Sequence, residues 1–147
     1  MRGMHTLHRF SLLLDRHPLV FAHLVFASGA LVLGAVVLWS RKGNTLHRSI
    51  GWTWVLLMTG ATLSAAFIRD YQLPNVAGLT PIHLFVVLVA WKLPVGVMHA
   101  RRGQVAAHRQ AMRGLYLGGC LLAGVFTLLP GRFLGSLLWP RLALLVA

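Results

Sequence analysis

Acidic residues are almost absent from this sequence of 147 residues. Asp15 and Asp70 are the only two, against 14 Lys and Arg, and the formal net charge is +12. A glycosidase needs a pair of carboxylates, and a calcium or magnesium site needs several oxygen ligands, so these classes are excluded. A Ser-His-Asp triad likewise has almost no Asp to draw on.

Cysteine is nearly absent as well, since Cys120 is the only one. A single thiol excludes an internal disulfide, a thiolate zinc site, the C-x-x-C-H haem attachment motif and an iron–sulfur cluster held by this chain alone. The eight histidines are therefore the residues best suited to bind a metal or to carry chemistry.

Charged residues of either sign are scarce, at 11%, whereas hydrophobic residues make up 57%. A chain this short cannot bury so much apolar surface in a globule, so lipid must cover part of it. The basic residues lie mainly between long apolar runs, where they fit anionic lipid headgroups better than nucleic acid. The sequence predicts an integral membrane protein whose partner is the lipid bilayer, with no nucleic-acid partner.

Four apolar stretches predict membrane-crossing helices, each of which takes about 20 residues. They cover residues 18–40, 49–68, 81–99 and 115–129, and the last reaches the necessary length when it is extended back to His108. Short loops make neighbouring helices antiparallel. We predict an all-α fold, a four-helix up-down bundle that forms one membrane domain over residues 1–147, with short interfacial helices at 4–14 and 133–147.

The two halves of the chain resemble each other, because several residues recur 60 or 61 positions later. The matches are Arg41-Lys42-Gly43 with Arg101-Arg102-Gly103, His47-Arg48 with His108-Arg109, and His23 with His83. We predict two tandem two-helix repeats, at residues 18–70 and 78–132, related by a pseudo-twofold axis along the membrane normal.

The basic residues also favour one orientation in the membrane. The loops 41–48 and 101–113 lie on the same face and hold seven Lys and Arg, whereas the only interhelix loop on the other face holds Arg69. An excess of Lys and Arg marks cytoplasmic loops, so we predict both termini on the periplasmic side.

The predicted repeat places histidines in pairs across the bundle. His23 faces His83 near one membrane surface, and His47 faces His108 near the other. Two imidazoles are too few for zinc, which takes three or four protein ligands, but they suit haem iron, which needs only axial ligands. The sequence thus predicts two b-type haems with bis-histidine ligation and electron transfer across the membrane, as in a membrane oxidoreductase of the cytochrome b kind.

Three basic residues are candidate neighbours of these haems. Arg48 and Arg109 directly follow histidines and could bind haem propionates. Lys92 lies near the middle of the third span, where a charge is costly and often functional. It could neutralise a propionate, carry protons or bind a substrate, or it could snorkel to an interface.

Two other functions fit the same residues. A haem-free transporter or assembly subunit would use the histidines and Lys92 to line a polar path. A copper or zinc site would combine His47, His99 and His108 on the basic loop face. The sequence does not define the electron donor and acceptor, for which a quinone, a ferric chelate or a redox protein would serve, and it leaves a homodimer open.

Four short motifs carry a family resemblance. They are Arg41–Trp52, Pro81–His83, Arg101–Met112 and Pro130–Arg132. On these motifs the sequence, over residues 18–135, resembles a family of bacterial predicted membrane proteins of unknown function. The resemblance implies a four-helix fold in a bacterial membrane, for which we expect the inner, cytoplasmic membrane. More loosely, the histidine layout is similar to that of diheme transmembrane b-type cytochromes, although the chain shows no ascorbate-binding motif.

Overall fold

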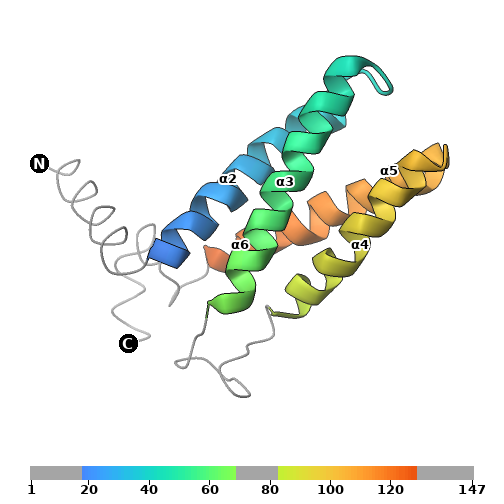
Figure 1. The fold of residues 1–147 in the computed structure, drawn as a ribbon. Coiled ribbons are helices and arrows are strands. Elements are labelled where there is room, and N and C mark those ends of the chain that lie inside the picture. The colour runs from blue at the N-terminus through green and yellow to red at the C-terminus, as the bar shows by residue number, and fades with distance from the viewer. Residues whose placement is uncertain (1–17, 69–82, 129–147) are drawn as a thin grey trace, which may run out of the picture. The chain divides into compact units, whose positions relative to one another are not determined.

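The computed structural model describes residues 18–68 and 83–128. Within these ranges every element is a helix and no strand is present, so the predicted all-α class is confirmed. The elements are α2 (Pro18–Trp39), α3 (Thr45–Phe67), α4 (His83–Arg101), α5 (Val105–Gly114), the π-helix η1 (Leu115–Leu122) and α6 (Ala123–Thr127) (Figure 1). The terminal helices predicted at 4–14 and 133–147 lie outside the described residues.

Three of the described helices are long and apolar enough to cross a membrane. They are α2, α3 and α4, with 22, 23 and 19 residues, and each coincides with a predicted span. The fourth predicted span falls on α5, η1 and α6, which follow one another without a break over residues 105–127. This stretch is helical as expected, and its passage through the membrane stays a prediction.

The contacts within the chain define two compact units, Met1–Trp91 and Lys92–Ala147. The division falls inside α4, which is itself one uninterrupted helix. The up-down arrangement of four helices and the tandem repeat stay predictions.

In the first unit, α2 and α3 pack side by side as a hairpin (Figure 1). Small residues let the two helices approach closely, because a Cβ atom at Gly60 would lie 3.0 Å from the Phe26 ring. One hydrogen bond also crosses the pair, from Trp54 Nε1 to the carbonyl oxygen of Ala30 at 2.9 Å. Both residues are buried, so the bond fixes how α3 is rotated against α2.

The turn between α2 and α3 is held by local polar contacts. Lys42 Nζ donates to the carbonyl oxygens of Leu38 and Ser40 at the end of α2. Asn44 caps the start of α3, because its Oδ1 accepts from the backbone N–H of His47 at 2.7 Å. Gly43 provides the turn with a positive φ of 85°, a conformation that favours glycine.

In the second unit, α5 folds back along the C-terminal part of α4 (Figure 1). Gly103, with a φ of 71°, lies in the turn between them, as Gly43 does in the first unit. Gly96 on α4 brings the helices together, since a Cβ atom there would meet Met112 and would lie 3.3 Å from Ala111 Cβ. Gly43 and Gly103, which are matched in the predicted repeat, thus each give a turn between two helices its positive φ.

We predict that Trp54→Phe lowers the free energy of unfolding by about 1 kcal/mol, because the phenyl ring keeps the packing but loses the donor to Ala30. Unfolding in detergent, followed by circular dichroism, measures the change. Trp39→Phe is the matched control, since Trp39 ends α2 with 84% of its surface exposed. Equal effects of the two substitutions would show that the hydrogen bond contributes nothing.

Candidate functional site

His23 lies on α2 and bonds across to α3. Its Nδ1 lies 3.0 Å from the carbonyl oxygen of Ala61 and 3.1 Å from Ser64 Oγ. A carbonyl oxygen can only accept, so Nδ1 carries the proton and donates it. The Ser64 hydroxyl, only 6% exposed, donates its own proton back along α3, 2.8 Å from the Gly60 carbonyl oxygen. In the neutral ring of His23 the lone pair therefore lies on Nε2.

His108 lies on α5 and repeats this pattern in the second unit. Its Nδ1 lies 2.9 Å from the carbonyl oxygen of Gly96 on α4, so this nitrogen again donates. Gly96 is buried at the closest approach of α4 and α5. The hydrogen bond orients the ring and leaves the lone pair on Nε2, as in His23.

His47 occupies the first turn of α3 and bonds to the end of α2. Its Nδ1 lies 3.2 Å from Ser40 Oγ, and Ser40 Oγ itself donates to the carbonyl oxygen of Val37 at 2.9 Å. Because a hydroxyl has one proton, Ser40 accepts from His47 Nδ1. Three of the four repeat-matched histidines thus donate through Nδ1.

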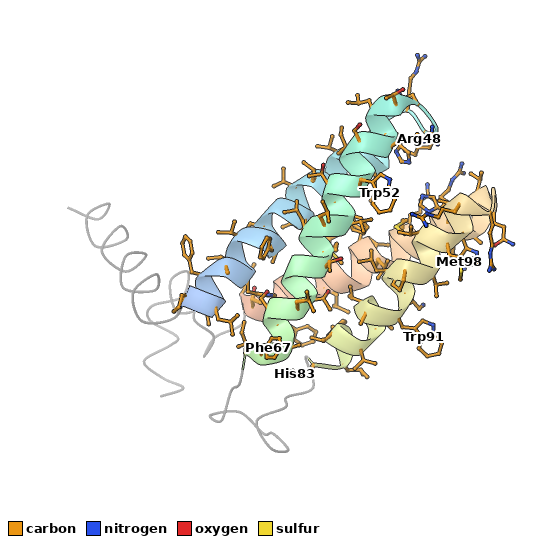
Figure 2. The ribbon with its side chains drawn as sticks, viewed as in Figure 1. Arg48, Trp52, Phe67, His83, Trp91 and Met98 are labelled. Atoms are coloured by element: carbon orange, nitrogen blue, oxygen red, sulfur yellow. The ribbon has the colours of Figure 1, made fainter. Side chains whose placement is uncertain are left out.

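His83 is the exception among these four. It is the first residue of α4, and its Nε2 lies 3.1 Å from the carbonyl oxygen of Ile68, just after α3 (Figure 2). Nε2 is therefore the nitrogen that donates, and Nδ1 carries the lone pair. Sequence alone does not predict this difference from His23, its repeat equivalent.

The structure brings His23 and His83 to one end of the first unit. Both bond near the C-terminal end of α3, His23 at Ala61 and Ser64 inside the helix and His83 at Ile68, the residue that follows it. Those acceptors span roughly 10 Å along the helix. His47 lies at the opposite end of α3 in this unit, and His108 belongs to the second unit.

The three basic candidates are all exposed. Arg48 follows His47 in the first turn of α3, and Arg109 follows His108 in α5. Figure 2 labels Arg48 at the turn end of the α2–α3 hairpin. Lys92 lies at the middle of α4, on a helix that continues through Pro94. The two arginines thus share a helical turn with a histidine, whereas Lys92 does not.

A three-histidine metal site is the alternative predicted for the basic loop face. Among the described residues, no three His, Cys, Asp or Glu side chains gather into a group that could hold a metal ion. His99 instead pairs its Nδ1 with Gln104 Oε1 at 2.5 Å, and His108 bonds to Gly96. His47 belongs to the first unit and His99 and His108 to the second, so the copper or zinc site stays a prediction. A bis-histidine haem needs only two such ligands.

Sequence reasoning missed the residues that orient the histidines. Ser64, Ser40 and the carbonyl of Gly96 were not candidates, yet each accepts from an imidazole. A hydroxyl inside an apolar span is a signal for a polar partner, but the partner's identity depends on the depth and rotation of the neighbouring helix. The π-helix η1 was also missed, although such segments often occur at functional sites.

Comparison with known proteins agrees with the resemblance noted in the sequence. A family described as a predicted membrane protein (DUF2306) matches residues 20–135, which include every described helix except the first two residues of α2. No curated protein and no solved structure matches the chain. Since the match covers well over half of the sequence, the chain belongs to this family of predicted membrane proteins, DUF2306.

Proposed function

We propose that the protein transfers electrons across the membrane through two b-type haems, one ligated by His23 and His83 and the other by His47 and His108. The observation that carries the proposal is the Nδ1 hydrogen bond of His23 and of His108 to a backbone carbonyl. These two histidines are one ligand of each proposed haem.

This hydrogen-bond pattern suits a metal ligand. Metal-ligating histidines nearly always donate the other ring N–H to a carboxylate, a backbone carbonyl or water, which fixes the tautomer and raises the basicity of the ligating nitrogen. In His23 and His108 the nitrogen left with the lone pair is Nε2, at the far tip of the ring. His47 adds a third ring that donates through Nδ1, to a serine hydroxyl.

The effect of iron ligation on the hydrogen bond of His83 depends on which ring nitrogen binds the metal. Its Nε2 donates to the Ile68 carbonyl, which follows the last residue of α3. Ligation through Nε2 would release that carbonyl, whereas ligation through Nδ1 would keep it. Either way the ring lies at the same end of α3 as His23, which is the placement that a shared haem requires.

The surface of α3 beside one of the proposed ligands is open. Gly51 follows His47 by one helical turn on the same face of α3, and a Cβ atom at Gly51 would meet nothing within 4 Å. Gly29 and Gly60, by contrast, are filled by Leu57 and Phe26 of the facing helix. A macrocycle bound at His47 would find room at Gly51, and Arg48 beside it would pair with a propionate.

Each haem, when bound, would supply one-electron chemistry at iron. The chain's contribution would be to hold two such centres at opposite ends of its spans, since His23 and His47 bond to opposite ends of α3. Electrons would pass between a donor and an acceptor, such as a quinone, a ferric chelate or a redox protein, on the two sides. With the termini periplasmic, His47 and His108 would serve the cytoplasmic side of a bacterial inner membrane.

The visible spectrum tests the proposal directly. The protein, purified after expression with an adequate haem supply, is expected to show low-spin b-type bands and about two haems per chain. His23→Ala is expected to remove about half of the haem and to leave the centre at His47 and His108. His99→Ala is the matched control and should keep both. A colourless wild-type protein would overturn the proposal in favour of a haem-free transporter or assembly subunit.

A second test addresses the hydrogen bond behind His23. Ser64→Ala removes the hydroxyl that accepts from Nδ1, so haem at this site is expected to bind about tenfold more weakly. Its reduction potential should rise, because a less basic imidazole stabilises ferric iron less. Haem titration and redox titration measure both effects. Thr62→Ala is the control, since its Oγ1 bonds only along α3, to the Met58 carbonyl. If the two variants behave alike, Ser64 does not position a ligand.

A further inference from the structure

Lys92 is a charged residue at the centre of a membrane-spanning helix. It lies nine residues from each end of α4, a candidate span of 19 residues. Nine residues of helix correspond to about 14 Å, and a lysine stem of four carbons reaches roughly 6 Å. Snorkelling therefore does not bring the ammonium group to either interface along a straight path.

None of the predicted spans contains an acidic residue that could serve as a counter-ion for this ammonium group. Its only acidic side chains are Asp15, which precedes α2 in sequence, and Asp70, which follows α3. In the described ranges Lys92 makes neither a hydrogen bond nor an ion pair. Its neighbours one turn away on α4 are Leu88, Val89, Val95 and Gly96, none of which has a polar side chain.

The surface around Lys92 is exposed and apolar. Trp91 and Leu84 are each 73% exposed, and Leu88 adds a further apolar side chain. Figure 2 shows Trp91 projecting away from α4. A helix of another membrane protein could pack on these side chains while it supplies the missing charge.

We propose that this face of α4, defined by Leu84, Leu88, Trp91 and Lys92, docks a transmembrane helix of a partner protein that carries a carboxylate at mid-depth. Charge complementarity selects the partner: the ammonium group needs an anion, and the four charged residues nearest to it in sequence are all arginines. A second copy of this chain is excluded at this position, because two Lys92 groups would repel and no span contains an acid. Lipid phosphates lie at the interfaces rather than at the centre of the bilayer.

The test uses a model helix as the probe. A membrane-spanning Leu/Ala peptide with one central Glu, and its Gln counterpart, are each titrated into vesicles that contain the full-length protein, and association is followed by energy transfer between attached dyes. The wild-type protein is expected to bind the Glu peptide about tenfold more tightly than the Gln peptide. Lys92→Met should abolish the preference, and Lys92→Glu should transfer it to a peptide with a central Lys.

Lys42→Met is the matched control, since Lys42 is the only other lysine and lies in the turn after α2. This variant should keep the full preference for the Glu peptide. The proposal fails if the wild-type protein does not distinguish Glu from Gln, or if Lys92→Met retains the distinction. Circular dichroism of each variant checks that the helices are intact.

Discussion

Lipid offers no hydrogen bonds, so each polar group inside a span must find its partner within protein. This constraint explains which side chains face each other in the first unit. The Trp54 indole reaches the Ala30 carbonyl, and the His23 imidazole reaches Ala61 and Ser64. Among the described residues, no buried side-chain nitrogen or oxygen lacks a partner. Because these bonds cross from one helix to the other, they fix the rotation and the relative depth of α2 and α3 together.

Close approach of the helices is the condition for such bonds. Gly29 and Gly60 provide it in the first unit, where Leu57 and Phe26 fill the space beside them. Gly96 provides it in the second unit, and its carbonyl accepts from His108 at the same point. Small residues therefore contribute to the candidate sites indirectly, by bringing an acceptor on one helix within reach of an imidazole on the next.

Hydropathy alone was enough to predict the helices, because apolar length is the physical requirement for crossing a bilayer. The sequence also indicates the turns, since the repeated glycines Gly43 and Gly103 both adopt a positive φ. It does not indicate which ring nitrogen of each histidine donates a hydrogen bond. Whether His83 donates through Nε2 or Nδ1 depends on which carbonyl lies beside it, and that follows from helix rotation, which hydropathy does not encode. The π-helix η1 also has no sequence signal that we could use, since its residues are ordinary helix formers and glycines.

The same constraint separates the histidines from Lys92. Each of the four repeat-matched histidines donates a ring N–H to an acceptor of its own chain. The acceptor lies on a neighbouring helix, in a turn or at a helix end. Such a ring has a hydrogen-bond partner within its own chain. Lys92 has neither a described partner nor an acid elsewhere in the spans. A polar group that the chain satisfies is suited to a ligand held inside it, whereas one that the chain leaves unsatisfied is suited to a partner outside it.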